Sequence, residues 1–198
     1  MKAQLFKTSL LIWAIFTVLC GIIYPLFITG ISGLFFPEQS GGSLLQNDKA
    51  IIGSALIGQT FTRPEYFHGR PSATDPPYNA NGSGASNFGP SNADFIRQVR
   101  DRIAGVRRLE KLTADEIIPA DMVTSSASGL DPHISVESAM LQARRVAGAR
   151  GTDISEVEKM VYRNTESPFL GIWGRKRVNV LKLNMAMDRN GFNPHEPK

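Results

Sequence analysis

A run of 30 consecutive residues without a charged side chain, from Thr8 to Pro37, constrains this chain more than any other feature. A helix needs about 20 apolar residues to cross a hydrocarbon core roughly 30 Å thick. A cleavable signal peptide has a shorter apolar region, of about 7–15 residues, followed by small residues, whereas this run ends in Phe35-Phe36-Pro37. We therefore predict a retained transmembrane helix within residues 1–37 and a soluble domain over residues 38–198.

Charges at the two ends of the run predict its orientation. Lys2 and Lys7 precede it and Glu38 follows it, so the positive-inside rule predicts a cytoplasmic N-terminus and an extracytoplasmic soluble domain. Of the 22 Lys and Arg residues, 2 precede the run, so 20 basic and 18 acidic residues lie beyond it. This near balance gives no electrostatic argument for binding nucleic acid. The only cysteine, Cys20, lies inside the run, which excludes disulfides and cysteine-ligated metal sites in the soluble domain.

Small residues recur every four positions along the expected anchor, at Thr17, Gly21, Pro25, Thr29 and Gly33. Small residues at this spacing let a second transmembrane helix approach closely, so they are candidates for helix packing. The alternative, that these residues do not mark a packing face, stays open for two reasons. Gly and Pro are common in membrane helices in general, and a four-residue step drifts by about 40° at 3.6 residues per turn.

Helical periodicity in the soluble domain predicts three helices. The first begins at a cap formed by Ser91 or Asn92, with Asp94 placed for a capping box. The second runs from a cap at Ser135 to about Ala149, and the third from about 154 to 164, with Ser155 and Glu158 as its capping box.

Alternating or branched apolar residues predict strands over residues 49–56, 122–124 and 177–188. The alternation is clearest in the last of these, where Leu181, Leu183 and Met185 are separated by polar or small residues. Strands and helices without regular βα alternation predict an α+β fold, with a small sheet and about three helices in a single domain after the transmembrane helix.

A long polar segment, Gly69–Asn92, separates the first strand from the first helix. Between Pro71 and Asn92, 15 of 22 residues are Gly, Pro, Ser or Asn, a composition that favours neither helix nor strand. Loops of this length in compact domains are usually functional or disordered. Phe67, Tyr78 and Phe88 can attach the segment to the domain, so we predict an ordered surface loop.

The soluble domain lacks the sequence signatures of common catalytic sites. There is neither a GxxxxGK[ST] phosphate loop nor a GxSxG nucleophile elbow. His68, His133 and His195 lack metal-ligand spacing, and His195 lies in a Pro-rich tail that we expect to be mobile. We predict no catalytic residue and no metal ligand. The alternative is a membrane-anchored extracytoplasmic enzyme that uses His68 and Arg70, which requires a carboxylate or hydroxyl at about 3 Å from His68.

A Ser- and Gly-rich segment before the second helix is a weak candidate for binding an anion. Ser125, Ser128 and Gly129 can offer hydrogen-bond donors to a phosphate, and Asp131 follows them. Ordinary turn chemistry explains the same residues, since Asp-Pro sequences commonly lead into helix caps.

Three blocks of sequence resemble a known family. They are GQTFTRPEYFHGRPSATDPPYNANGSGASNFGPSN, VTSSASGLDPHISVESA and RVNVLKLNMAMD, in this order after an N-terminal anchor. The chain resembles the C subunit of the bacterial potassium-transporting Kdp P-type ATPase over nearly its whole length. The resemblance implies a non-catalytic accessory subunit of a high-affinity potassium uptake pump in the bacterial inner membrane.

The resemblance also implies partners. These are a channel-like potassium-binding subunit, a P-type ATPase subunit that hydrolyses ATP, and a small membrane subunit. The family is associated with ATP, which implies a nucleotide role for Ser125, Ser128, Gly129 and Asp131 but no intrinsic cofactor. For a subunit of this kind we expect the long loop to contact a partner through a set of polar and aromatic residues, namely Arg70, Ser72, Tyr78, Asn79, Asn81, Ser86, Asn87 and Asn92.

Overall fold

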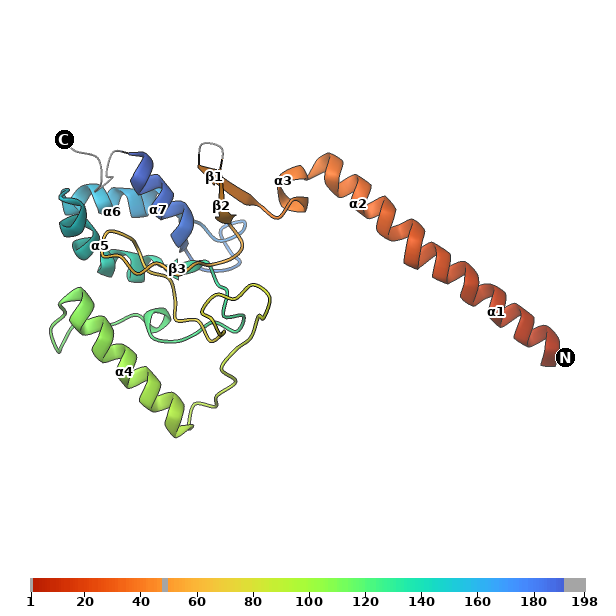
Figure 1. The fold of residues 1–198 in the computed structure, drawn as a ribbon, viewed down its shortest axis with the longest axis horizontal. Coiled ribbons are helices and arrows are strands. Elements are labelled where there is room, and N and C mark those ends of the chain that lie inside the picture. The colour runs from red at the N-terminus through yellow and green to blue at the C-terminus, as the bar shows by residue number, and fades with distance from the viewer. Residues whose placement is uncertain (1, 48–49, 191–198) are drawn as a thin grey trace.

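A single long helix leads into the folded domain in the computed structural model, which describes residues 2–47 and 50–190 (Figure 1). The helix consists of α1 (Lys2–Val18), a π-helical turn η1 (Leu19–Ile23) and α2 (Tyr24–Phe35). It is 34 residues long with a hydropathy of 2.4, and none of its most apolar window is buried within the chain. Its length and composition suffice to cross a membrane.

The π turn lies immediately before Pro25. The backbone N–H of Tyr24 bonds to the carbonyl of Leu19, five residues earlier, whereas an α-helix uses a four-residue step. Pro25 has no N–H to donate, and its ring conflicts with the carbonyl four residues before it. The wider turn accommodates this proline without breaking the helix.

A two-stranded sheet follows the anchor. The short helix α3 (Pro37–Ser40) leads into β1 (Leu44–Asn47), which pairs antiparallel with β2 (Ala50–Ser54). The strand predicted over residues 49–56 is confirmed for β2, although Lys49 lies outside the described residues. The partner strand β1 was not predicted.

The second sheet has the order β3-β5-β4, with both pairs antiparallel. Its strands are β3 (His133–Ser135), β4 (Thr165–Glu166) and β5 (Arg177–Asn179). Three helices pack with it in the upper part of Figure 1, α5 (Val136–Arg150), α6 (Ile154–Arg163) and α7 (Val180–Arg189). Their inward faces and the sheet form one core, which includes Phe67, Val146, Val157, Val161, Val178, Leu183 and Met187.

The remaining long helix, α4 (Ala93–Glu110), lies below the other helices in Figure 1. Its N-cap is Asn92, whose side chain accepts a hydrogen bond from the backbone N–H of Phe95. The cap is therefore Asn92 rather than Ser91, and Asp94 pairs with Arg97 instead of closing a capping box. Phe95, Val99, Ile103 and Val106, which recur at helical spacing and were expected to face inward, are only half-buried.

A buried ion pair attaches α4 to the core. Glu110 at the end of α4 accepts a hydrogen bond from Nε of Arg145 on α5 at 2.9 Å, and both side chains are almost fully buried. The guanidinium also donates to the carbonyls of Pro64 and Tyr66 and to Oε1 of Gln142. One side chain thus holds together α4, α5 and the segment before the long loop.

The α+β class and the single N-terminal apolar helix are confirmed. The prediction of one small sheet and about three helices is wrong, because the described residues form two small sheets and four helices of ten or more residues after the anchor. Residues 122–124 form no strand, since Ala120–Met122 is a 3-10 turn. The cap of α6 is Asp153, not Ser155.

The strand predicted over residues 177–188 is wrong beyond Asn179. Asn179 ends β5 and caps α7 by accepting a hydrogen bond from the N–H of Lys182. The buried residues of α7 include Val180, Leu183, Asn184 and Met187, which follow the i, i+3, i+4, i+7 spacing of one helix face. The apolar residues of this segment are compatible with both the two-residue period of a strand and the 3.6-residue period of a helix.

Candidate functional site

Two buried amide side chains fix the start of the long loop. Asn184 on α7 accepts a hydrogen bond from the N–H of Phe67 at 2.8 Å and donates to its carbonyl at 3.0 Å. Gln142 on α5 makes the same pair of bonds to His68, at 2.8 and 3.1 Å. Phe67 is 0% exposed, so its backbone N–H and C=O groups need hydrogen-bond partners within the protein. The two side-chain amides supply the partners that a neighbouring strand would supply in a sheet.

The loop then folds back on itself around Tyr78. The Tyr78 hydroxyl donates to the carbonyl of Arg70 at 2.6 Å, and its backbone N–H donates to Oγ of Ser72 at 3.0 Å. Burial, followed by the nearby Asp131 charge, raises the pKa of the Tyr78 hydroxyl to about 12. The hydroxyl therefore remains protonated and keeps donating at physiological pH.

The folded part of the loop lies on the turn formed by residues 125–131. Ser72 donates to the carbonyl of Gly129 at 2.7 Å, while Ser83 and the N–H of Gly84 both donate to the carbonyl of Ser128. Asn79 continues the network by accepting from the N–H of Asn81 and donating to the carbonyl of Asp75. These bonds confirm the prediction of an ordered loop.

Glycine is required where the two segments meet. Gly129 has a φ of +68°, a conformation that favours glycine, and a Cβ there would lie 2.8 Å from the carbonyl oxygen of Gly84. Gly58 lies against the Tyr78 ring, which a Cβ would approach to 2.4 Å. The close contact between loop and turn therefore depends on the absence of side chains at both positions.

The predicted contact residues fall into two groups. The structure places Arg70, Ser72 and Tyr78 against the turn, where they form hydrogen bonds within the chain, although Nε of Arg70 is buried without a hydrogen-bond partner among the described residues. Asn79 bonds to other residues of the loop. Asn81, Ser86 and Asn87 are exposed, and Asn92 caps α4. Phe88 lies 6.4 Å from the ring of Phe95 on α4, which attaches the second half of the loop.

A chain of ionisable side chains runs beside the turn. Arg70 pairs with Asp131 at 3.0 Å, and His133 lies 3.5 Å from Asp131 on one side and 3.5 Å from Glu166 on the other. Burial acts to raise the pKa of the Asp131 carboxyl, but hydrogen bonds from His133 and Arg70 outweigh it and lower that pKa below its usual value of 3.8. Asp131 is thus held as a carboxylate.

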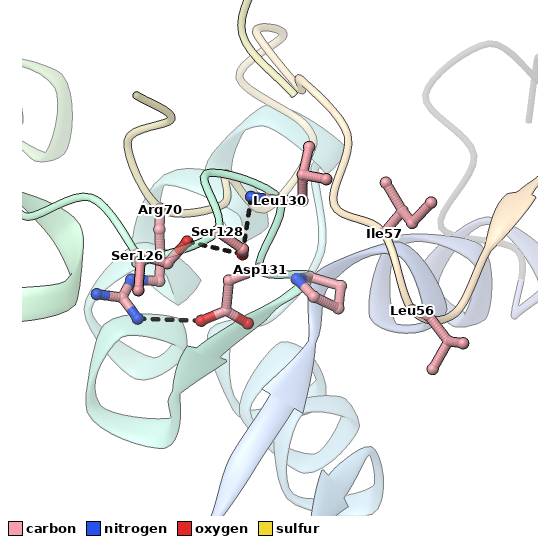
Figure 2. A pocket seen from close by; sticks show the side chains of 9 residues that line it. Leu56, Ile57, Arg70, Ser126, Ser128, Leu130 and Asp131 are labelled. Atoms are coloured by element: carbon pink, nitrogen blue, oxygen red, sulfur yellow. Dashed lines mark hydrogen bonds and ion pairs between the residues drawn. The ribbon is translucent and has the colours of Figure 1, made fainter. Parts of the chain in front are cut away.

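A pocket of about 560 Å³ opens between this turn and the end of β2. Figure 2 shows Arg70, Ser126, Ser128 and Asp131 along one side and Leu56 and Ile57 on the other. Two backbone donors of the turn are used within it, since the N–H groups of Gly129 and Leu130 bond to the hydroxyls of Ser126 and Ser128. Ser125 offers its carbonyl to Arg70 at 3.5 Å. The turn thus uses part of its hydrogen-bonding capacity internally, and it also accepts hydrogen bonds from the loop.

The enzyme alternative lacks the contact on which it depends. The ring Nε2 of His68 lies 3.1 Å from the backbone carbonyl of Arg63, not beside a carboxylate or hydroxyl. Burial and the nearby Arg145 charge lower the pKa of His68. In the described part of the chain, no group of three or more His, Cys, Asp or Glu side chains has the geometry to hold a metal ion. His195 lies outside the described residues.

The small residues of the anchor are all exposed within the isolated chain. Thr17 donates its hydroxyl to the carbonyl of Trp13 at 2.8 Å, an ordinary bond along the helix axis. Gly21 lies in the π turn, and a Cβ at Gly21 or Gly33 would meet nothing within 4 Å. Helix packing at these positions stays a prediction.

Comparison with known proteins identifies the family. The family model described as K+-transporting ATPase, c chain, matches residues 6–189, which include both the apolar helix and the folded domain. The chain belongs to the KdpC family. This confirms the resemblance found in the sequence.

Several curated relatives support the assignment to the KdpC family. A potassium-transporting ATPase KdpC subunit from Beijerinckia indica is 51% identical over 174 residues, 88% of both chains. The protein of the same name from Mycobacterium bovis is 47% identical over 189 residues, 96% of this chain and 100% of the relative. That from Polaromonas naphthalenivorans is 48% identical over 186 residues, 93% of this chain and 94% of the relative.

Sequence reasoning missed two parts of this KdpC site. His133 was considered only as an isolated histidine, yet it joins Asp131 to Glu166 across the β3-β5-β4 sheet. Gln142 was not considered and Asn184 was expected to be a polar, outward residue of the predicted strand, although both lie at helix positions that face the core. Polar residues on otherwise apolar helix faces were the available signal, because buried polar groups need partners.

The Asp131 network predicts a pH-dependent contribution to stability. A carboxyl with a lowered folded-state pKa stabilises the fold above its unfolded-state pKa, and this contribution is lost as pH falls through the folded-state value. We expect Asp131→Asn to lower the free energy of unfolding by about 1–2 kcal/mol at neutral pH, and the difference to shrink once the pH falls below 3.8. Urea denaturation at a series of pH values measures this difference in the free energy of unfolding. Asp115→Asn, at an exposed position, is the control, and an Asp131→Asn deficit that does not change with pH would contradict the ionic explanation.

Proposed function

We propose that this KdpC family member is a non-catalytic accessory subunit of an ATP-driven, high-affinity potassium uptake pump. Its role is to stabilise the assembly of a channel-like potassium-binding subunit with a P-type ATPase subunit and a small membrane subunit. The observation that carries the proposal is the family match over residues 6–189, because the curated relatives are named as subunits of a potassium-transporting ATPase.

The geometry of the domain supports a binding role. Ser72, Tyr78 and Nη1 of Arg70 form hydrogen bonds within the chain, which supports a role of these side chains in shaping a surface. A loop on a rigid support is a common location for recognition residues. We therefore propose that the loop contacts a partner subunit through its exposed residues, including Asn81, Ser86 and Asn87.

The apolar helix supports a membrane location. The helix from Lys2 to Phe35 has no buried residue in its most apolar window, and so large an apolar surface is stable only in lipid or against other helices. We propose a retained single-pass anchor in the bacterial inner membrane. Lys2 and Lys7 support a cytoplasmic N-terminus and an extracytoplasmic domain.

Purification of the tagged full chain from its native membrane in mild detergent tests the proposal. We expect a channel-like subunit and a P-type ATPase to be recovered with it. The variant Asn81→Glu with Ser86→Glu adds two charges at exposed loop positions and should reduce recovery of the partners about tenfold, which corresponds to ~1.4 kcal/mol of binding free energy.

The control for the loop variant is Ala114→Glu, which adds a charge at an exposed position outside the loop. Both variants should keep the melting temperature of the parent chain, since neither changes a buried contact. Repeated recovery of the parent chain alone would contradict the subunit role. Normal recovery of partners by the loop variant would contradict only the proposed loop contact.

A nucleotide role at Ser125, Ser128, Gly129 and Asp131 is a second candidate. The pocket of about 560 Å³ beside Arg70 favours it, whereas the internal use of the Gly129 and Leu130 N–H groups and the Asp131 carboxylate oppose the binding of a phosphate. Equilibrium dialysis of the full chain in detergent against ATP distinguishes the two roles, because a purely structural turn gives no saturable binding.

A further inference from the structure

The connection between β4 and β5 exposes a group of large apolar side chains. Phe169, Leu170, Ile172 and Trp173 are 72, 71, 74 and 63% exposed. We refer to residues Phe169–Trp173 as the hairpin tip. Soluble surfaces carry single exposed apolar residues, but a contiguous cluster of this kind marks a site of interaction with protein or membrane.

The backbone of the hairpin tip is bonded within the tip. Phe169 and Trp173 exchange two backbone hydrogen bonds, at 2.9 and 3.0 Å, and the N–H groups of Gly171 and Ile172 bond to the carbonyls of Pro168 and Phe169. The rings of Phe169 and Trp173 lie 6.4 Å apart. A segment that enters an apolar environment must satisfy its backbone polar groups internally, and much of this one already does.

The turn of the hairpin tip has a leucine, Leu170, at a position whose backbone conformation favours glycine or a small polar residue. Leu170 has a φ of 52° and Gly171 a φ of 74°, the left-handed conformation of both central positions in a tight hairpin turn. Leucine adopts this conformation at a cost in energy, and its side chain is exposed, so packing within the chain does not explain it. Strain of this kind is typical of functional positions.

Basic residues follow the tip directly. Arg175, Lys176 and Arg177 are all exposed, and Arg177 pairs with Glu166 at 3.0 Å. Aromatic and aliphatic side chains next to Lys and Arg are the composition of segments that enter the boundary between lipid headgroups and acyl chains. The basic side chains attract anionic headgroups near the surface.

The anchor keeps the folded domain near the bilayer. Residues 36–43 separate α2 from β1, and a chain of this length spans at most roughly 28 Å. The connection between β4 and β5 lies on the side of the domain that faces α2 in Figure 1. A protein groove would also bury the tip, but the flanking positive charges and the short tether favour lipid.

We propose that the hairpin tip inserts into the headgroup boundary of the same bilayer that α1 and α2 cross, with Arg175 and Lys176 against anionic headgroups. This inference rests on the membrane anchor proposed above. It gives the domain a second attachment, which fixes its orientation relative to the membrane.

The chain has two tryptophans, Trp13 in the anchor and Trp173 in the tip, which allows a direct test. The variant Trp13→Phe, reconstituted in phosphatidylcholine–phosphatidylglycerol vesicles, reports on Trp173 alone. We expect brominated phospholipids, especially those brominated near the headgroup, to quench the Trp173 emission. We also expect this emission to lie at a shorter wavelength than that of the chain in detergent-free urea. The variant Trp173→Phe reports on the anchor, so quenching of Trp13 shows separately whether the anchor is in the bilayer.

Charge variants complete the test. Arg175→Gln with Lys176→Gln, in the Trp13→Phe chain, should lose most of the extra quenching that anionic lipid gives over phosphatidylcholine alone. Quenching of Trp13 without quenching of Trp173 would overturn the proposal while leaving the anchor intact. A Trp173 emission that responds only when the other pump subunits are present would also overturn it, in favour of a protein contact. Loss of quenching at both positions would refute the anchor, and the proposal with it.

Discussion

Replacement of Arg145 by methionine is expected to be the most destabilising single substitution considered for this chain. The change leaves Glu110 buried without its cation and removes donors from the carbonyls of Pro64 and Tyr66. Breaking a buried ion pair by removing one partner costs about 3–5 kcal/mol. Burial already raises the pKa of Glu110 against the opposing effect of Arg145, so the lone carboxyl should take up a proton in the variant.

Urea denaturation of the full chain in detergent, followed by circular dichroism, measures the loss. Arg144→Met is the matched control, because Arg144 is the exposed neighbour on the same helix. The double variant Glu110→Gln with Arg145→Met should be more stable than Arg145→Met alone, since glutamine avoids the cost of protonating a lone buried carboxyl at neutral pH. Equal unfolding midpoints for Arg145→Met and Arg144→Met would show that the buried pair does not hold α4 to the core.

Asn184→Leu is expected to have the second largest effect. The amide of Asn184 is the partner of both the N–H and the carbonyl of Phe67, and Phe67 is fully buried. A leucine of similar size fills the space but leaves two buried backbone groups unsatisfied, at about 1–3 kcal/mol each. We expect a total loss of about 2–4 kcal/mol, because burial of the apolar leucine side chain offsets part of this cost. The same denaturation assay measures it.

The control for this variant is Asn81→Leu, the same substitution at an exposed position of the loop. It should change stability by less than about 0.5 kcal/mol. If Asn184→Leu were as stable as this control, water or a rearranged backbone would be replacing the amide. The hydrogen bonds from Asn184 to the Phe67 backbone would then not be needed for folding.

Local signals in the sequence were sufficient for the anchor and for most helix starts. The charge-free run predicted the helix of residues 2–35, and Asn92 and Ser135 were identified as caps, since capping depends on residues only two or three positions apart. The strand prediction for residues 180–188 was wrong because the apolar residues there fit both a strand and a helix. The Asn179 cap, at the end of β5, determines that the chain continues as a helix.

The candidate site could be predicted only in part. The order of the loop followed from Tyr78 and the Asx-type bonds of Asn79, which are local. Its support on Ser128 and Gly129 is a contact between segments more than 40 residues apart, and single-sequence periodicity contains no information on such pairs. The hairpin tip was missed because it is neither periodic nor rich in any residue type that signals chemistry.

The π turn of the anchor changes the geometry of its small residues. A wider turn takes up more residues per rotation than an α-helix does, so a four-residue step through Leu19–Ile23 comes closer to one full rotation. Thr17, Gly21 and Pro25 therefore lie nearly in line along one face, whereas Thr29 and Gly33, in regular α2, turn progressively away by about 40° per step. The irregularity that accommodates one proline thus aligns the small residues in the middle of the anchor in a nearly straight row, whereas those nearer its C-terminal end wind around the helix.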